Sequence, residues 1–392
     1  MSYPNPEWRA AFPVVANSVY LNHAAVSPIA QAVRQAMVAL LDDVHHHGAW
    51  NWMQWNEMME NARRRAATLI GAQPREIGFL KNTSEGLATV AMGIDWRPGD
   101  RVVCIASEFP ANLYPWLALR QQGVVVELLQ EGPEGIDLEE LRRRCRGARL
   151  LAVSFVQFFS GFRLDPAAVG AICLETGTLL VMDGIQGLGA FPINVKAAGV
   201  HVLAADAHKW LTGPEGIAIF FVDEAVLEQI RPREVGWMSV ENFNDRETVR
   251  RQFDPSADWP WRPGTARFEC GTANTVGLAG LGAALEMLTG IGLETIAASV
   301  LERRDQLALG LQQRGARLLG AQAAERNPNS RSGIVTFQMP GQESQALHSK
   351  LAARKICCAL RGGAVEGWWV RCSPHFYNDA GDIEAVLQAL EG

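Results

Sequence analysis

The strongest candidate for a reactive residue is Lys209, in the stretch A-D-A-H-K-W-L-T-G-P-E-G from Ala205 to Gly216. It lies between an apolar run and a Gly/Pro turn, and burying an ammonium group costs free energy. Such a lysine therefore tends to lose its proton or to find a charged partner. The free amine is the form that attacks an aldehyde to make a Schiff base. By its own setting, Lys209 is either a Schiff-base nucleophile or a structural lysine.

Asp183 strengthens the first of these two interpretations. It stands upstream of Lys209, at the end of the apolar run Leu179–Met182. A carboxylate at a strand end can keep a pyridine nitrogen protonated, which gives the ring the character of an electron sink. The same carboxylate could instead cap a turn with Gly184.

Three further segments place binding groups after expected strands. Asn82-Thr83-Ser84-Glu85-Gly86 opens a helix and would offer hydroxyl and N–H groups to a phosphate, or simply cap the helix through Thr83 or Ser84. Phe109 could lie flat on an aromatic cofactor or belong to the core. Arg371 could clamp a substrate carboxylate or form a surface ion pair.

Other patterns argue against metals, nucleotides and nucleic acids as ligands. Three adjacent histidines, His45 to His47, cannot all face one ion on a helix, so we expect no metal site there. The glycine-rich nucleotide loops and the Gly-x-Ser-x-Gly elbow are missing from the sequence. A net charge of −6 leaves no basic footprint for nucleic acid.

The cysteines and the N-terminus bear on where the protein works. Seven cysteines without a Cys-x-x-Cys pair argue against a disulfide framework or structural zinc and favour a reducing compartment. The first residues lack the basic and apolar regions of a signal peptide, and no apolar run reaches membrane-spanning length. We expect a cytoplasmic protein with neither a membrane nor a nucleic acid as partner.

Short apolar runs alternate with helix-like stretches between about residues 30 and 300. Continuous β-branched runs of this kind are typical of strands buried on both faces of a parallel sheet. The expected strands are Ile77–Leu80, Arg101–Ala106, Val124–Leu129, Leu150–Phe155, Thr178–Met182, His201–Ala205 and Gly216–Val222. The expected helices are Ser84–Met92, Leu113–Gln122, Leu138–Arg146 and Pro166–Thr176. This order predicts a doubly wound α/β domain, whose ligands bind beyond the carboxyl ends of the strands.

The rest of the chain divides into three parts. Arg231–Pro263 is rich in proline and tryptophan and has no period, which predicts a long functional loop near a site or an interface. A helix-rich stretch follows Gly271. Runs such as Gly333–Phe337 and Trp368–Cys372 then predict a smaller α+β domain.

The candidate residues follow one another in a characteristic order: a hydroxyl loop, an aromatic residue, Asp-x-x-Gln, His-Lys, Gly-Thr and an arginine. This order resembles the class V aminotransferase family of pyridoxal-phosphate (PLP) enzymes of fold type I. The family includes cysteine desulfurases, selenocysteine and cystine C–S lyases, kynureninases and isopenicillin-N epimerase-like proteins. The resemblance extends from Tyr20-Leu-Asn-His-Ala-Ala25 to Arg371-Cys-Ser-Pro374-His-Phe-Tyr377.

The resemblance implies an architecture and a cofactor. It implies an α/β fold whose large PLP-binding domain, residues 18–280, has a mostly parallel seven-stranded sheet flanked by helices. A smaller α+β domain would cover residues 281–392, and an N-terminal segment, residues 1–17, would pack on it. The partner of the chain would be a second copy, in a homodimer with shared active sites.

The resemblance also assigns roles to individual residues. Lys209 would form the Schiff base and shuttle protons, Asp183 would pair with the pyridine nitrogen, and Gln186 would bond the phenolic oxygen. The phosphate would be held by Thr83, Ser84 and His208, with Thr272 reaching it from the partner subunit. Phe109 would stack on the ring, and Arg371 and Arg361 would bind the substrate.

Three departures from the family pattern limit the range of reactions to be expected. Phe109 stands where the stacking residue is often histidine, so an acid/base group beside the substrate is missing. Asp206 stands where many members place a phosphate-binding hydroxyl. The segment that matches the desulfurase loop, Leu360-Arg-Gly-Gly-Ala-Val-Glu-Gly367, has no cysteine, and Cys357 and Cys358 before it are expected to be buried, inert thiols.

We therefore expect an enzyme that acts on a small α-amino acid by a β-elimination of the C–S lyase type. Transamination and epimerisation remain alternatives, and a desulfurase, a PLP-fold scaffold without turnover or an α/β enzyme without PLP is less favoured. Tryptophans in two segments could line the entrance and admit a bulky substrate: Trp50, Trp52, Trp55, Trp237, Trp259 and Trp261.

Overall fold

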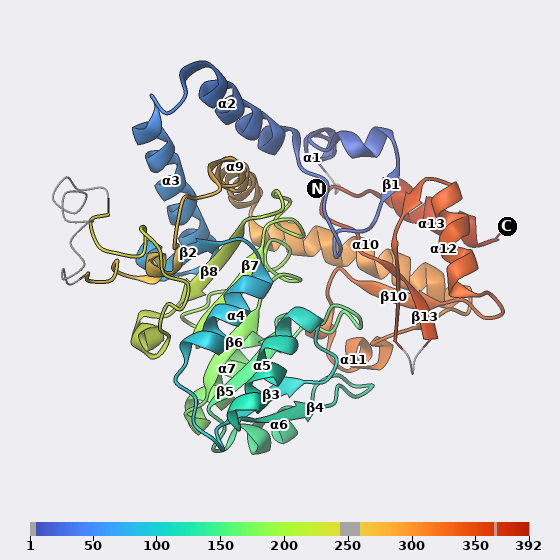
Figure 1. Cartoon of the computed structure of the whole chain (residues 1–392). Helices are drawn as coiled ribbons and strands as arrows, with labels where there is room; N and C mark the ends of the chain where they lie inside the picture. Colours follow the sequence, from blue (N-terminus) through green and yellow to red (C-terminus); the bar gives the residue numbers. More distant parts are fainter. Residues whose placement is uncertain (1–4, 244–258, 364–366, 392) are drawn as a thin grey trace.

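The computed structural model describes residues 5–243, 259–363 and 367–391 (Figure 1). Parts of the expected loop Arg231–Pro263 and of the segment Leu360–Gly367 therefore lie outside the described residues. The centre of the fold is a seven-stranded sheet with the order β2-β8-β7-β6-β5-β3-β4. Its strands are β2 (Ile77–Leu80), β3 (Arg101–Ile105), β4 (Val125–Leu129), β5 (Leu150–Ser154), β6 (Leu179–Asp183), β7 (Val202–Asp206) and β8 (Ala218–Val222).

Every expected strand is present, displaced by no more than two residues at its ends. The sheet is mostly parallel, as expected, because only β8 runs antiparallel to its neighbours β2 and β7. Strands β5, β6, β7 and β8 are buried along their whole length. Alternate residues enter two separate cores, since Val181 packs on one face and Leu180 on the other. This double burial explains the continuous apolar runs.

Helices cover both faces of the sheet. One core includes side chains of α4 (Thr83–Gly93) and α5 (Tyr114–Ala118), and the other includes α6 (Leu138–Cys145) and α7 (Pro166–Thr176). Asp137 and Asp165 cap α6 and α7 by accepting N–H bonds of their first turns. The expected helix Leu113–Gln122 is α5 followed by a 3-10 turn over Leu119–Gln122.

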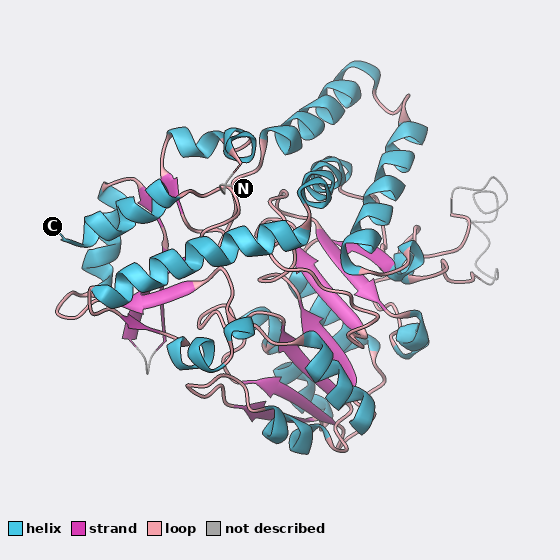
Figure 2. Ribbon diagram, turned by 180° about the vertical axis from the view of Figure 1, so that it is seen from behind, coloured by secondary structure: helices cyan, strands magenta, loops and turns pink. Residues whose placement is uncertain are grey.

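Long helices connect the large sheet to the C-terminal part (Figures 1 and 2). Helices α2 (Gln31–His47) and α3 (Trp52–Ile70) form an arm that packs on α9 (Thr275–Ile291), and α10 (Leu293–Gln313) runs on from α9. In the described ranges no single helix is long and apolar enough to cross a membrane. Helices α9 and α10 pass that criterion only as a pair bent by 83°.

The C-terminal part has its own antiparallel sheet, with the order β12-β13-β10-β9, and its own core around Phe337 and Val370. Its strands are β9 (Arg317–Leu318), β10 (Val335–Gln338), β12 (Ala359–Gly363) and β13 (Gly367–Cys372). Its helices are α11 (Ala321–Arg326), α12 (Ser344–Ala353) and α13 (Ala380–Glu391). The runs Gly333–Phe337 and Trp368–Cys372 predicted β10 and β13, whereas β9 and β12 were missed.

The N-terminal residues are tied to this C-terminal part. Strand β1 (Val19–Tyr20) pairs in parallel with β11 (Ile356–Cys357). Helix α1 (Pro6–Ala10) carries Arg9, whose guanidinium lies 2.7 Å from a carboxylate oxygen of Asp382 in α13. Arg9 and β1 therefore contact the C-terminal part, while the assignment of residues 1–17 as a separate segment and the domain boundaries stay predictions.

Candidate active site

A cavity of about 350 Å³ opens at the carboxyl ends of β6 and β7. The fold brings to it nearly all the side chains that the sequence singled out, together with Asp206 and with residues that were given no role at the site, among them Ala24, Ala25 and Phe158. The predicted residues in its wall are Thr83, Ser84, Phe109, Asp183, Gln186, His208, Lys209, Arg361 and Arg371. Of the predicted set, only Thr272 lies elsewhere. This cavity is the candidate active site.

Lys209 follows β7 and is 9% exposed. Desolvation lowers the pKa of its ammonium group to about 8, while the negative charge of Asp183 acts in the opposite direction. Its Nζ lies 5.5 Å from the centroid of the Phe109 ring. The ammonium group therefore loses its proton more readily than that of an ordinary lysine, and it lies next to an aromatic face.

Asp183 ends β6 and is 2% exposed. Burial raises the pKa of its carboxyl group to about 6, while a hydrogen bond from the Ile185 N–H and the charge of Lys209 oppose the shift. That bond, 2.9 Å from N to Oδ1, fixes the carboxylate at the strand end. A buried carboxylate so held can pair with a cationic ring nitrogen.

The N-terminus of α4 forms another part of the wall. The cap is Asn82, whose Oδ1 accepts the Glu85 N–H, and not Thr83 or Ser84 as the alternative reading supposed. The buried Thr83 Oγ1 accepts the Asp206 N–H at 2.9 Å, which ties α4 to β7. The first N–H groups of a helix have no partner within it and attract an anion.

Asp206 lies beside His208. Its Oδ1 is 3.0 Å from His208 Nδ1, within ion-pair distance, but the two atoms are not aligned as a hydrogen bond and Oδ1 has no other partner among the described residues. The Asp206 side chain is 6% exposed. At this position of the family pattern the chain thus places a buried carboxylate beside His208 and offers no hydroxyl to a phosphate.

Arg371 is 1% exposed and forms no ion pair with any described residue, which rules out the alternative of a surface ion pair. Its Nη1 donates to the Phe158 carbonyl at 2.7 Å, while Nε and Nη2 have no partner in the described ranges. Burial, and to a smaller degree the charge of Arg361, lowers its pKa to about 9. A buried cation with unpaired donors in a cavity wall is suited to bind a carboxylate.

Arg361 reaches the same wall through the β12–β13 hairpin. Ala359 pairs with Arg371 in this antiparallel ladder, so Arg361, two residues further on, faces the same side as Arg371. Half-buried, it donates to its neighbour's carbonyl, and burial lowers its pKa. The sequence had no strand assigned here, and the hairpin explains how both arginines meet.

Phe109 and Gln186 complete the predicted wall. Phe109 is 44% exposed and meets Phe158 edge to face, with 5.2 Å between ring centroids, so it is not a core residue. Gln186 is buried, and both ends of its amide are bonded: Nε2 donates to the Ala24 carbonyl and Oε1 accepts from Trp210.

Glu108 is a buried acid that sequence reasoning missed. Its carboxylate accepts the Ser154 N–H and the Gln157 amide, each at 2.8 Å, and the Ser154 hydroxyl. Burial raises its pKa to about 7 against these hydrogen bonds. Since Glu108 precedes Phe109, it anchors the segment that presents the ring; its position after β3 is the one available sequence signal.

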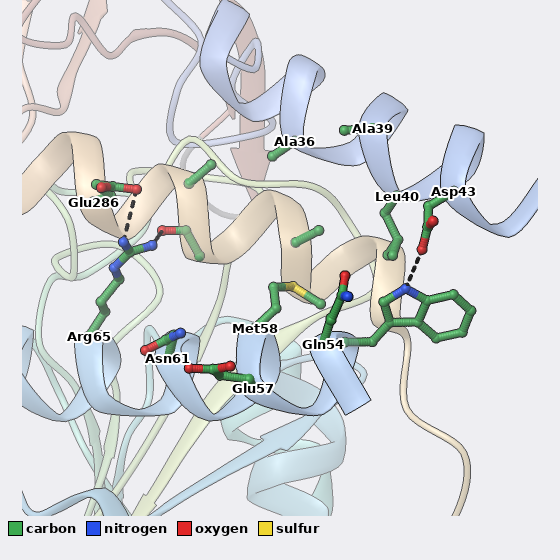
Figure 3. Close-up of a pocket in the computed structure, with 14 residues that line it drawn as sticks. Ala36, Ala39, Leu40, Asp43, Gln54, Glu57, Met58, Asn61, Arg65 and Glu286 are labelled. Atoms are coloured by element: carbon green, nitrogen blue, oxygen red, sulfur yellow. Dashed lines mark hydrogen bonds and ion pairs between the residues drawn. The ribbon is translucent and has the colours of Figure 1, made fainter. Parts of the chain in front are cut away.

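Thr272 and the tryptophans do not line this cavity in the described chain. Thr272 is exposed and lies at another pocket, with Cys270 and Asn274. Trp55 belongs to a cavity between α2, α3 and α9, and its indole donates to Asp43. Figure 3 shows this cavity, with Asp43 and Leu40 of α2 opposite Met58 of α3. Trp50 is 88% exposed. The expectation of a tryptophan-lined entrance therefore finds no support among the described residues.

The adjacent histidines lie at an exposed helix end, and of the two cysteines expected to be buried only Cys358 is. His45, His46 and His47 end α2 at its exposed last turn. Cys358 is buried, and burial raises the pKa of the half-buried Cys357 thiol. In the described ranges, no cysteine lines the active-site cavity.

The residues present fit pyridoxal phosphate. The cavity offers a desolvated amine for the aldehyde and a buried carboxylate for the ring nitrogen. It also has a helix N-terminus with His208 for the phosphate, and an aromatic face at Phe109. The unpaired Nε and Nη2 of Arg371 leave a place for the substrate carboxylate.

Comparisons with known proteins agree with this fit. Residues 19–386 match the aminotransferase class-V family. A probable cysteine desulfurase of Pyrococcus abyssi is 28% identical over an alignment of 401 positions, which covers 98% of this chain and 96% of that protein. The apo structure of a cysteine desulfurase from Thermococcus onnurineus NA1 has 27% identity and a TM-score of 0.89, covering 100% of this chain and 98% of the other.

Two structures of the protein C-DES share the fold at 22% identity. One, a mutant with glycine covalently linked to its PLP cofactor, has a TM-score of 0.87 and covers 99% of both chains. The other, described as the cystine C–S lyase C-DES with its product cysteine persulfide, has a TM-score of 0.86 and covers 97% of this chain and 98% of that one.

Fold and site thus define a fold type I enzyme that depends on pyridoxal phosphate. The chain belongs to the aminotransferase class-V family.

Proposed function

We propose that the protein is a C–S lyase that eliminates a sulfur leaving group from the β-carbon of a small α-amino acid. One observation carries the proposal: the cavity joins a desolvated base, Lys209, to an unpaired carboxylate clamp, Arg371, and its described wall contains no thiol. A desulfurase needs a thiol to accept the sulfur atom, whereas an elimination releases it with its substituent.

The chain's own groups can carry out this reaction. Bound pyridoxal phosphate supplies an electron sink for negative charge at the α-carbon. Arg371 fixes the substrate carboxylate and so orients the α C–H bond toward the Lys209 amine, which takes the proton. Asp183 balances the positive charge on the ring nitrogen.

The bonds and products balance as an elimination. The α C–H electrons form the new C=C bond, and the C–S electrons leave with sulfur, which takes up a proton. Water then converts 2-aminoacrylate to pyruvate and ammonia. Phe109 places an apolar ring, and no extra acid, beside the substrate, so the proton for the sulfur comes from Lys209, which has just taken one from the α-carbon.

The cysteine desulfurase relatives make sulfur amino acids the first class to test. The segment Leu360–Gly367 has no cysteine in its sequence, which argues against a persulfide on this loop. The cystine C–S lyase of the same fold gives a precedent for elimination within it.

A panel of cysteine, cystine and S-substituted cysteines tests the proposal, with Lys209→Ala as the inactive control. We expect equimolar pyruvate and ammonia with release of the thiol or persulfide. Alanine with protein-bound sulfur would show a desulfurase. A 2-keto acid that keeps its side chain, with a shift to the pyridoxamine absorbance, would show transamination, and inversion at the α-carbon would show epimerisation.

A further inference from the structure

Gln186 is held in one orientation by two groups of opposite polarity. The indole N–H of Trp210 can only donate, so the Gln186 atom 2.9 Å from it must be the carbonyl oxygen. The Ala24 carbonyl can only accept, so the atom 2.9 Å from it must be the amide nitrogen. The chemistry of these two partners therefore fixes the orientation of the amide.

This arrangement leaves Gln186 one N–H to offer. The amide nitrogen has two protons, and the Ala24 carbonyl takes one of them. The amide lies in the wall of the active-site cavity with Lys209 and Asp183, and Nε2 has no second acceptor among the described residues. The cavity thus receives a donor from Gln186, never its carbonyl oxygen.

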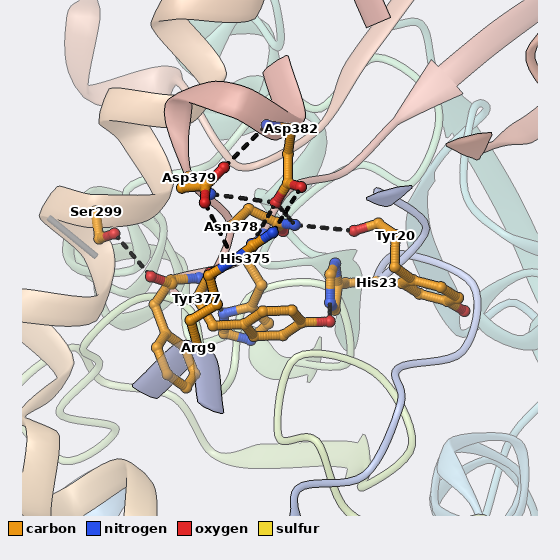
Figure 4. A network of polar contacts seen from close by, with 10 residues as sticks. Arg9, Tyr20, His23, Ser299, His375, Tyr377, Asn378, Asp379 and Asp382 are labelled. Carbon is orange, nitrogen blue, oxygen red and sulfur yellow. Dashed lines mark hydrogen bonds and ion pairs between the residues drawn. The ribbon is translucent and has the colours of Figure 1, made fainter. Parts of the chain in front are cut away.

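Trp210 is itself fixed at its backbone. His375 Nδ1 accepts the Phe376 N–H at 2.8 Å, so the ring proton is on Nε2, which donates to the Trp210 carbonyl at 2.9 Å. Burial lowers the pKa of His375 to about 4, so the ring is neutral at neutral pH. Figure 4 shows His375 within the network that joins α13 to the N-terminal residues.

The Trp210 side chain is equally confined. It is 1% exposed, and a Cβ added at Gly333 would lie 2.3 Å from the indole Cη2, so only glycine allows this packing. Ala24, the other partner of the Gln186 amide, is also held in place. Its N–H donates to Ser373 Oγ, and His23 Nδ1 hydrogen-bonds the Ser373 carbonyl. Residues just after β13 therefore hold both anchors of the Gln186 amide.

We propose that Trp210 is a positioning residue that makes Gln186 a hydrogen-bond donor to the cofactor's ring oxygen. The inference rests on the proposed placement of that oxygen beside Gln186. A donor stabilises the deprotonated, anionic oxygen and so favours release of the proton that it shares with the linkage to Lys209. Without the Trp210 N–H only the Ala24 carbonyl still orients the amide, so the amide is held less firmly and its hydrogen bond to the ring oxygen weakens.

The test is the pH midpoint of the visible absorbance of the cofactor-loaded enzyme. In Trp210→Phe, which keeps an aromatic ring and removes the N–H, we expect the midpoint to rise by up to about one pH unit, the effect of fully losing one hydrogen bond to a charged group. Trp96→Phe is the matched control, since its indole donates to the Ala91 carbonyl away from the cavity, and its midpoint should not move.

A double-variant cycle separates positioning from packing. Gln186→Ala should raise the midpoint by itself, and adding Trp210→Phe to it should then change nothing, because no amide is left to orient. A normal midpoint in Trp210→Phe with a shifted one in Gln186→Ala would overturn the role of Trp210 and leave Gln186 in place. Normal midpoints in both would overturn the placement of the ring oxygen as well.

Thermal unfolding of each variant without cofactor shows whether the fold is retained. If the phenyl ring is not accommodated, Trp210→Met fills the same space with a flexible side chain that has no N–H, and the same rise is expected. These midpoints require no substrate, so a failure of the proposed lyase activity leaves the result readable.

Discussion

At the scale of single residues, burial brings the pKa values of the two central groups, Lys209 and Asp183, closer to each other. It lowers the pKa of the Lys209 ammonium to about 8 and raises the pKa of the Asp183 carboxyl to about 6, because both charged forms lose hydration. Each group is thereby brought closer to neutral pH. Such opposite shifts in one cavity are typical of a site that moves protons.

The pKa of Lys209 predicts how the enzyme without cofactor captures PLP. Only the free amine attacks the aldehyde, so the rate of capture should rise with pH and level off above about pH 8. Mixing the cofactor-free protein with PLP and following visible absorbance measures this rate. Lys209→Ala should show no such band, and a rate that still climbs as far as the ordinary pKa of lysine would contradict the prediction.

The buried carboxylate of Asp183 is expected to destabilise the cofactor-free protein while it favours cofactor binding. Its folded pKa is raised, so its contribution to stability is full below the ordinary carboxyl pKa and is lost as pH rises toward about 6. Asp183→Asn keeps an acceptor for the Ile185 N–H. Without cofactor, it should stabilise the protein at pH 8 by roughly 1–3 kcal/mol and give little gain near pH 4.

Thermal unfolding with and without PLP checks this prediction. With cofactor, the variant should lose its advantage because the ring nitrogen has no anionic partner. Equal stability of the two cofactor-free proteins at pH 8 would show that the buried carboxylate carries no cost.

At the scale of elements, the site depends on how closely α4 approaches the sheet. The ends of β6 and β7 supply Asp183 and Asp206, and α4 brings Thr83 to the Asp206 backbone. Gly86 makes this approach possible, since a Cβ there would lie 2.8 Å from the Ala204 Cβ and 3.2 Å from Phe220.

Gly86→Ala should therefore push α4 away from β7 and cost about 1–3 kcal/mol. Retention of PLP during dialysis should fall as the helix N-terminus moves from the phosphate. Gly290→Ala is the helical control: nothing lies within 4 Å of its added Cβ, so stability should be unchanged or up to about 1 kcal/mol higher. Equal cofactor retention in both variants would contradict the role of the close packing.

At the scale of the whole molecule, one predicted cofactor residue lies outside the cavity. Thr272 is exposed in the single chain, at a pocket that includes Cys270 and Asn274. We propose that it completes the phosphate site of a second copy, as the family resemblance implies. A homodimer would then have two sites, each with Lys209 from one copy and Thr272 from the other.

Mixed dimers test this arrangement. Lys209→Ala should be inactive, and Thr272→Ala should bind PLP less tightly. Co-expression of the two variants should restore one intact site in each mixed dimer, because that site takes Lys209 and Thr272 from different chains. Activity per mixed dimer should reach about half that of the wild type by this count of sites. If verified mixed dimers recover no activity, the proposal that Lys209 and Thr272 of one site come from different chains is wrong.

Much of this molecule could be predicted from local sequence. The seven strands of the large sheet were visible as apolar runs because both faces of the sheet are covered, and helix caps such as Asp165 marked the starts between them. The β12 strand was missed because Ala359–Gly363 includes two glycines and has neither an apolar run nor a clear alternation. Glu108, His375 and Trp210 were missed because their partners are far away in the chain.

By itself the sequence determined the types and the order of the reactive groups, and through them the cofactor and the strands whose ends present them. Only the tertiary structure decided which groups are buried together, how far their pKa values shift, that Arg361 and Arg371 share one wall, and that Trp210 holds Gln186. Periodicity and residue type act over a few neighbouring residues, whereas desolvation and hydrogen-bond geometry depend on side chains that folding brings together from distant parts of the chain.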